Sequence, residues 1–578
     1  MSQALLSTAP LEAQAAGRRA ATVERMLGDP ADRANPAGHR RLLAADRAAT
    51  VCEGAEDVLD SFGMNAEFVP RALGGRFDSC ESLLRVMRPV WRRDVGLGMG
   101  YGMTTFMAAS DVWMRGTPDQ QRRLARLLLT GSKAAMAQHE TAHTNDFVRS
   151  QVRLAAGDRE LRITGAKPVI NNLQRADALV LFGRGAPDGD GLSTVLLDPR
   201  GLPADRFRIT RRPPADSVGL RGYFWAGARF TDCPVPREAL LGPPGGGVVT
   251  AERSFQLSRT LMAALVLAAV DSSLRTAVLV ERTRAPGAAA DPQNTATTLT
   301  KAFVNLLLYD SLAVVATRAL HLLPTETSVY SAAIKSLLPK VLRDTTYDLA
   351  TVLGSQLYAR DGTVGVFQKI VRDVPIISLG HAGTVACQTT IIPQLTTLAR
   401  TSWFKSEEAP AALFRPAEPL PPFSYGALAT AGGRDSLSAS LLATAASLPG
   451  GSVGERTLRA LAQRFVAELR DLRGRVLALQ PPGAPGARTT AWFALTDRYV
   501  LVLAAAAVLG VWRASDGLRD PFLADPAWAA CALHRIAERL GIRDVDLPPQ
   551  LAARVHQEVL ARFGDGHGFD LYNTPLPH

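Results

Sequence analysis

The chain has 578 residues, of which 47% are hydrophobic and 21% charged, and its formal net charge is +11. This composition is that of a globular protein and excludes a disordered or fibrous chain, and the length predicts two to four domains or one elaborated unit. The positive charge comes mostly from dispersed arginines and not from a basic block, which argues against nucleic-acid binding and fits anionic partners.

Nothing in the sequence indicates export or a membrane span. The longest uncharged apolar run, 499–512, is shorter than the roughly 20 residues that a membrane-spanning helix needs, so it predicts a buried helix. Residues 1–28 lack the apolar core of a secretory signal. The five cysteines are widely separated and form no Cys-x-x-Cys pair, which is typical of a reducing compartment. We therefore expect a cytoplasmic protein.

The first zone of the chain is helical. From about residue 15 to 135 the apolar residues recur at helical spacing. One helix start is marked by Thr117, Pro118 and Gln120, which form a capping box with proline at the first helical position. Gly131 predicts the end of that helix.

The second zone, from about 136 to 240, has a hydrophobic period of two. Turn residues at 156–158 and 185–191 predict hairpin loops between short strands. This zone is therefore expected to be an antiparallel β domain between helices.

Helical patterns return from 251 to about 399, a proline-rich stretch at 409–422 indicates a linker, and a second helical block follows from 435. The predicted fold class is α+β. Its expected parts are an N-terminal helical domain (1–135), a middle β-barrel domain (136–245), a helical bundle (246–405), and a linker with an extra C-terminal helical domain (406–578).

The segment His139-Glu140-Thr141-Ala142-His143 matches the pattern of zinc peptidases, in which two histidines one helical turn apart bind zinc and the glutamate is the general base. That chemistry requires the segment to lie inside a helix. The turn-forming residues 144–146 and the strand pattern after them argue against a helix, and no third ligand is obvious. A zinc peptidase is therefore the less favoured alternative, and we expect no metal.

Five segments in the correct order resemble the acyl-CoA dehydrogenase and acyl-CoA oxidase flavoproteins. The turn at 139–146 stands where that family carries Thr-Glu-Pro-x-x-Gly-Ser-Asp, and Glu140 and Asp146 match outright. The other segments are Gly-Thr-Pro-Asp-Gln-Gln at 116–121, Leu-Arg-Ile-Thr-Gly-Ala-Lys-Pro-Val-Ile-Asn-Asn at 161–172, Phe-Thr-Asp-Cys-Pro-Val-Pro at 230–236 with Leu-Leu-Gly at 240–242, and Arg-Asp at 372–373 with Gly-Thr at 383–384.

The resemblance implies FAD bound between a helical domain, a β domain and a helical bundle, with 406–578 similar to the extra domain of the longer members and a homodimer as the expected assembly. The implied substrate is an acyl group carried as a CoA thioester, on a carrier protein or as a free β-keto acid, with Arg259 as a contact. Val169 and Asn171 stand where the family's Trp and Thr flank the flavin ring. The full set of implied cofactor-binding residues is His139, Thr141, Thr144, Asn145, Val169, Asn171, Arg282, Gly354 and Thr384.

The family's catalytic glutamate is missing from this chain. Depending on the register, its position falls on His381 or on Ala382. Some members carry the base on an earlier helix, just before an arginine equivalent to Arg259, and here that residue is Ser258. The nearest acid, Glu252, lies almost two helical turns earlier. Neither known base position holds a carboxylate.

Three explanations for the missing glutamate are open. His381 could be the base, because imidazole titrates near neutrality. A β-keto acid could form its own enolate by losing carbon dioxide, as the epoxyketone synthases of this family are thought to do. Reduced flavin could also react with molecular oxygen in an oxidase or monooxygenase. We therefore expect an FAD-dependent oxidoreductase of specialised metabolism, with a zinc peptidase or a non-catalytic scaffold as alternatives.

Overall fold

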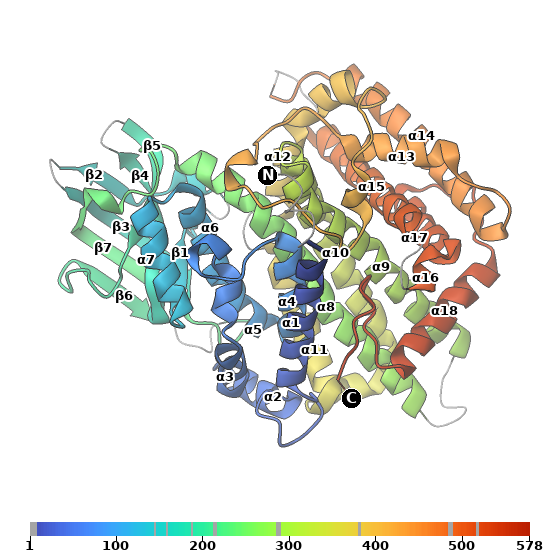
Figure 1. Ribbon diagram of the computed structural model, residues 1–578, viewed down its shortest axis with the longest axis horizontal. Coiled ribbons are helices and arrows are strands. Elements are labelled where there is room, and N and C mark those ends of the chain that lie inside the picture. Colours follow the sequence, from blue (N-terminus) through green and yellow to red (C-terminus); the bar gives the residue numbers. More distant parts are fainter. Residues whose placement is uncertain are drawn as a thin grey trace. The chain divides into compact units, whose positions relative to one another are not determined.

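The computed structural model describes residues 9–143, 146–157, 160–186, 189–211, 217–284, 291–379, 383–483, 489–515 and 520–577. The chain divides into two compact units (Figure 1). The first, called the sheet unit, comprises Thr22–Ser258 and Phe423–Gly426. The second, called the bundle unit, comprises Met1–Ala21, Arg259–Pro422 and Ala427–His578. The long helices α1 and α8 contribute residues to both units.

Short helices form the N-terminal part of the sheet unit. They are α2 (His39–Ala48), α3 (Glu53–Phe62), α4 (Cys80–Arg93), α5 (Val95–Leu97), the π-helix η3 (Gly98–Met103), α6 (Thr104–Arg115) and α7 (Pro118–Leu129), preceded by α1 (Ala9–Leu27). The predicted capping box is confirmed, since Thr117 and Gln120 bond to each other's backbone N–H. Gly131, with φ of 95°, follows the helix end as expected.

The strands of the sheet unit form one mixed sheet. Within the described residues they are β1 (Lys133–Ala137), β2 (Arg153–Ala156), β3 (Glu160–Asn171), β4 (Ala176–Ala186), β5 (Gly189–Leu197), β6 (Phe207–Arg211) and β7 (Trp225–Pro236). Their order is β1-β4-β2-β3-β7-β6, with β5 on β4. Both predicted hairpins, β2–β3 and β4–β5, are antiparallel.

The prediction of an antiparallel domain was wrong for two strand pairs, because β4 pairs in parallel with both β1 and β2. Period-two patterning reports which face a residue occupies and carries no information about strand direction. The parallel pairs need crossover connections that join strands far apart in the sequence.

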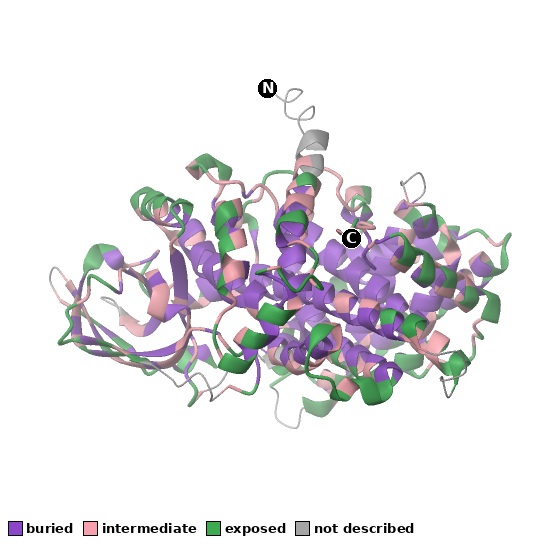
Figure 2. Cartoon of the chain, turned by 90° about the horizontal axis from the view of Figure 1, so that it is seen from below, coloured by how far each residue is buried: buried purple, intermediate pink, exposed green. Residues whose placement is uncertain are grey.

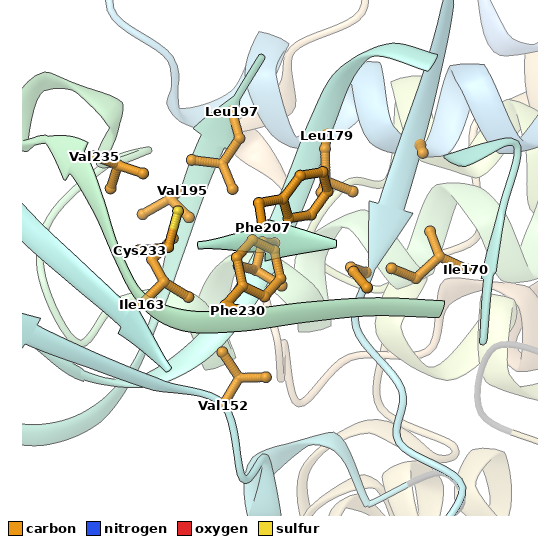
Figure 3. Packing of buried hydrophobic residues seen from close by; sticks show 14 of the residues in the cluster. Val152, Ile163, Ile170, Leu179, Val195, Leu197, Phe207, Phe230, Cys233 and Val235 are labelled. Carbon is orange, nitrogen blue, oxygen red and sulfur yellow. The ribbon is translucent and has the colours of Figure 1, made fainter. Parts of the chain in front are cut away.

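The two faces of the sheet have separate hydrophobic cores. Figure 3 shows the inner one, where Phe207 of β6 and Phe230 of β7 lie with ring centroids 5.1 Å apart. On the other face, side chains of β1 and β4 pack with those of α6 and α7, as Ala134 and Val180 do with Val112 and Leu128.

The bundle unit contains α9 (Pro292–Leu322), α10 (Thr327–Leu353), α11 (Gly362–Leu379) and α12 (Thr384–Thr397), with the larger part of α8 (Gly247–Thr283). The C-terminal helices are α13 (Ser436–Ser447), α14 (Val453–Ala478), α15 (Thr489–Ala514), α16 (Pro521–Ala524), α17 (Pro526–Leu540) and α18 (Pro549–Gly564). Of these, α15, α17 and α18 pack directly on α9, so the C-terminal helices share the core of the bundle.

Three bundle helices are long and apolar enough to cross a membrane by length and composition, namely α8, α9 and α15. Their most apolar windows are 83%, 94% and 83% buried inside the chain. Figure 2 shows buried residues, in purple, running through the helices. The predicted buried helix at 499–512 is confirmed as part of α15, where Tyr499 to Val511 are buried.

The proline-rich segment at 409–422 connects the bundle to the C-terminal helices and is packed against α9. Arg318, which is 0% exposed, donates from Nε to Ala412 O at 2.7 Å and from Nη1 to Glu418 O at 2.9 Å. His321 Nδ1 lies 2.9 Å from Pro421 O. The segment is thus a fixed strap, because buried side chains bind its carbonyl groups.

Candidate cofactor and substrate site

A buried ion pair holds the chain where it leaves β1. Lys167 Nζ on β3 lies 2.9 Å from Glu140 Oε1, 2.9 Å from Ser150 Oγ and 2.9 Å from Gln138 O. Glu140 also accepts from Ser150 Oγ at 2.8 Å and from the backbone N–H of Gln151 at 2.9 Å. These bonds tie both ends of the segment from 138 to 151 to β3.

The charges of this pair support each other. Burial alone would raise the pKa of Glu140, but the hydrogen bonds from Lys167 and from the N–H of Gln151 outweigh it and lower that pKa. Burial lowers the pKa of Lys167, and Glu140 opposes this effect. A buried charge with a close opposite partner keeps its ionised form, so we assign carboxylate and ammonium at neutral pH.

The zinc-binding geometry that the 139–143 pattern requires is absent. His139 and Glu140 lie outside any helix, and the next three residues form a turn, so the two histidines are not one helical turn apart. Glu140 is engaged with Lys167 and is not placed as a general base. Among the described residues no group of three His, Cys, Asp or Glu could hold a metal ion. The match to the peptidase pattern is therefore coincidental.

Several buried polar atoms on β3, on β7 and in the segment after β1 have no hydrogen-bond partner among the described residues. They are both amide atoms of Gln138, Nε2 of His143, Oδ1 of Asn171 and Nε1 of Trp225. A buried unpaired polar group costs about 1–3 kcal/mol. The acceptor of Asn171 on β3 and the donor of Trp225 on β7 stand on paired positions, and they fit a ligand with a polar heteroaromatic edge, such as the isoalloxazine of FAD.

The C-terminal end of β3 and the residues just before β7 contact the π-helix η3 and the start of α6. Asn172 adopts a left-handed conformation with φ of 62°, and its Nδ2 donates to Gly100 O at 2.6 Å. Tyr223 OH lies 3.3 Å from Thr104 Oγ1 at the start of α6. π-Helical turns are rare in proteins, and those that occur are often found at functional sites. The strand ends that carry Asn171 and Trp225 therefore rest on a rigid support.

The structure describes four of the six cofactor-binding residues predicted in the sheet unit. His139, Val169 and Asn171 are half-buried and Thr141 is exposed, and Asn171 is the one with an unpaired buried oxygen among these four. Thr144 and Asn145, expected at the pyrophosphate, lie outside the described residues. Their role stays a prediction.

The bundle unit contains two buried cations near the end of α11. Arg259 on α8 is 2% exposed, with Nη1 3.3 Å from Thr390 Oγ1 on α12, so the alternative of a surface arginine is excluded. Lys335 on α10 is 0% exposed and donates to Ile377 O of α11. Burial lowers the pKa of Lys335 to about 8, and the charge of Arg259 adds to this effect. The two positive charges therefore lie close enough to interact.

The remaining predicted residues of the bundle unit are His381, Thr384, Gly354 and Arg282. His381, the candidate base, lies outside the described residues, as does Ala382. Thr384 is the first residue of α12. Gly354 ends α10 with φ of 55°, a conformation that suits glycine. Arg282 is exposed at the end of α8, with its guanidinium 5.5 Å from the ring centroid of Phe563.

Sequence patterns did not predict three groups, of which Lys335 is buried and Trp225 is half-buried with a buried indole N–H. Trp225 and Lys335 carry no local signal, because their surroundings come from distant strands and helices. The third is Asp111 on α6, which is 0% exposed, and burial raises its pKa to about 7. A charged residue in an otherwise apolar helical stretch was the available clue for Asp111.

Comparisons with known proteins give one consistent fold. No model of a known protein family matches the chain. The mitochondrial isovaleryl-CoA dehydrogenase of Oryza sativa subsp. japonica is 24% identical over 230 residues, which is 39% of this chain and 55% of that protein. The chain thus spans about half the length of the curated relatives that it matches.

Solved structures extend the likeness over nearly the whole chain. An acyl-CoA dehydrogenase from Bacillus anthracis, complexed with FAD, has a TM-score of 0.66 and 13% identity over 96% of this chain and 95% of that one. The prolyl acyl carrier protein oxidase AnaB has a TM-score of 0.55 and 16% identity over 66% of this chain and 97% of that one. At these identities the structures show a shared fold, including the C-terminal helices.

Proposed function

We propose that the chain is a member of the acyl-CoA dehydrogenase superfamily and an FAD-dependent oxidoreductase acting on an acyl substrate, as its similarity to those enzymes supports. The observation that carries this proposal is the pair of unpaired buried polar atoms on Asn171 and Trp225, which face each other across β3 and β7. The network of Lys167, Glu140 and Ser150 fixes the segment after β1 on the same strand β3. Bound FAD would supply the electron acceptor. The protein's own residues would hold and orient it.

The absorption spectrum of the purified protein tests the cofactor. Flavin bands near about 370 and about 450 nm are expected, with a flavin that denaturation releases as FAD. A protein that purifies without flavin and takes up none when FAD is added would contradict the proposal.

A substrate that loses carbon dioxide in the site would best explain why the family's catalytic glutamate is missing. Loss of carbon dioxide from a β-keto acid breaks the bond between the α carbon and the carboxyl group and leaves the electron pair on the α carbon as an enolate. No residue then has to remove an α proton. The buried cations Arg259 and Lys335 support this proposal, because an anionic carboxylate is the kind of group that two buried positive charges attract. An oxidising step after decarboxylation makes this a decarboxylating desaturase or monooxygenase.

The second candidate, His381 as a general base, makes the opposite kinetic prediction. If decarboxylation is the route, a free β-keto acid releases carbon dioxide and reduces the flavin. His381→Ala then leaves both rates within about tenfold of wild type, less than the roughly 10²–10⁴-fold contribution of a general base. Rapid flavin reduction by a saturated acyl-CoA, abolished in His381→Ala, would favour the histidine. Arg259→Lys, which keeps the charge, should bind the β-keto substrate better than Arg259→Met.

We also propose that the enzyme serves specialised metabolism and, for a thioester substrate as the alternative to a free β-keto acid, that the acyl group arrives on a carrier protein. The support is the net charge of +11, which suits an acidic carrier, and the similarity in fold to the prolyl acyl carrier protein oxidase AnaB. Turnover of the carrier-bound substrate should fall steeply with ionic strength, whereas turnover of the CoA thioester should fall less. Equal salt dependence would argue against carrier recognition. A homodimer is expected and is checked by light scattering.

A further inference from the structure

The sheet has a tryptophan on β7, whereas the family resemblance places one on the neighbouring strand β3. Val169 on β3 stands where the resemblance expects a Trp, and an aliphatic side chain offers no face for stacking a planar ring. On the neighbouring strand β7, Trp225 lies directly opposite Asn171 in the antiparallel register. An aromatic side chain is therefore present next to the position that lost one.

Strand geometry places Trp225 on the same face as Asn171. Ile170 and its partner Ala226 point into the inner core of the sheet, where they are 1% and 0% exposed. Successive side chains of a strand point to opposite faces, so Asn171 and Trp225, the next regular pair, share the face opposite to that core. Diagonal neighbours across a strand pair are about 7–8 Å apart and within reach of an aromatic side chain. Val169 lies two residues before Asn171, inside the register irregularity between Lys167 and Ile170, and Trp225 is the aromatic residue on the strand paired with this part of β3.

The polar atoms of this pair are complementary to a ligand with both donors and acceptors. Trp225 Nε1 is a buried donor and Asn171 Oδ1 a buried acceptor, and neither has a hydrogen-bond partner among the described residues. The pyrimidine edge of a flavin presents carbonyl acceptors and an N–H donor side by side. The two orphaned atoms match such an edge in kind.

Contacts within the sheet unit hold the indole in place. The rings of Tyr223 and Trp225 lie with centroids 5.3 Å apart, and Gln174 Nε2 donates to Trp225 O at 3.2 Å. Asn172, next to Asn171, donates its backbone N–H to Phe224 O at 2.9 Å. A binding group held by its neighbours loses little freedom when a ligand binds.

We propose that Trp225 takes over the aromatic wall of the flavin site from the β3 strand, and that its N–H and the amide oxygen of Asn171 bond to the polar edge of the ring. This inference rests on the proposed function, because it assigns residues to the FAD of that proposal. It goes beyond that proposal by moving the aromatic contact to another strand.

The test removes the indole and then returns it to β3. Trp225→Val should weaken FAD binding to the flavin-free protein by about tenfold or more, since it loses both the aromatic contact and the hydrogen bond. The double variant Val169→Trp/Trp225→Val should recover most of that loss. Trp225→Phe keeps a ring without the N–H, so it should lose about fivefold and shift the flavin absorption bands. Trp512→Phe in α15, whose Nε1 donates to Ala524 O, is the matched control and should bind like wild type.

The possible failures are distinguishable. A wild-type protein that binds no FAD overturns both the function and this inference. If the wild type binds FAD and Trp225→Val binds it with an affinity within about twofold of wild type, only the role of Trp225 is overturned. The loss of one hydrogen bond or ring contact would weaken binding by more than that. Trp225→Val could also bind FAD more weakly because its melting temperature is lower. If the double variant then does not recover binding, the role of Trp225 in the flavin site is overturned, and Trp225 only packs in the fold.

Discussion

Two lysines, one in each unit, are both 0% exposed and have different surroundings. Lys167 in the sheet unit contacts the carboxylate of Glu140 and two further oxygens. Lys335 in the bundle unit donates to a helix carbonyl, that of Ile377. Burial disfavours the charge of both, and Glu140 offsets this at Lys167. The comparison teaches that a carboxylate balances the charge of Lys167 within the fold, whereas the hydrogen-bond partner of Lys335 is a neutral carbonyl group, which is why we propose it for an anionic substrate.

Breaking the pair in the sheet unit should have the largest effect. Lys167→Met leaves the carboxylate of Glu140 buried beside Ser150 with no cation, and removal of one partner of a buried pair costs about 3–5 kcal/mol. Urea unfolding measures this loss. The double variant Lys167→Met/Glu140→Leu should recover part of it, whereas a single-variant loss below about 1 kcal/mol would mean that the pair is not structural.

Lys335 in the bundle unit should make the unfolding free energy depend on pH. Because its folded pKa of about 8 is below the ordinary 10.5, the unfolded chain binds the proton more tightly between these values. The unfolding free energy of wild type relative to Lys335→Met should therefore rise with pH across that window, by up to about 3 kcal/mol. Denaturation of both proteins at several pH values checks the slope. A flat difference would mean that Lys335 keeps an ordinary pKa.

A neutral buried group gives an intermediate case. Asn172→Ala loses the hydrogen bond to Gly100 O and forces alanine into a left-handed conformation, so about 2 kcal/mol of unfolding free energy should be lost. Asn172→Gly tolerates that backbone and should lose about 1 kcal/mol. Equal losses in the two variants would show that the backbone conformation contributes nothing.

An exposed cap sets the lower end of the scale. Thr117→Ala removes the capping box of α7 and should cost about 1 kcal/mol. Asp119→Asn in the same helix, with a side chain that is 92% exposed, breaks the surface pair with Arg122 and should cost at most about 0.5 kcal/mol. Thermal unfolding compares the two. A larger cost for Asp119→Asn would reverse the expected ranking of cap and surface pair.

Local patterns predicted much of the fold. The period change near residue 136, the capping box at Thr117 and the hairpins at 156–158 and 185–191 all correspond to observed elements, because each depends on residues close in the chain. The parallel pairing of β1 with β4 was not predictable, since it joins residues about forty positions apart. The strap at 409–422 was read as a linker, since its composition does not reveal that Arg318 binds its carbonyl groups.

The sequence alone determined the order of elements, the resemblance to FAD-dependent acyl-CoA oxidoreductases and the loss of the family's glutamate, because these depend on residue identity and short spacings. Only the tertiary structure decided that Glu140 is an ion-pair partner and not a zinc-site base, that Arg259 is buried, and that Trp225 lies opposite Asn171. The physical reason is that charge, burial and strand register depend on groups distant in sequence, and a residue's chemistry follows from what folding places around it.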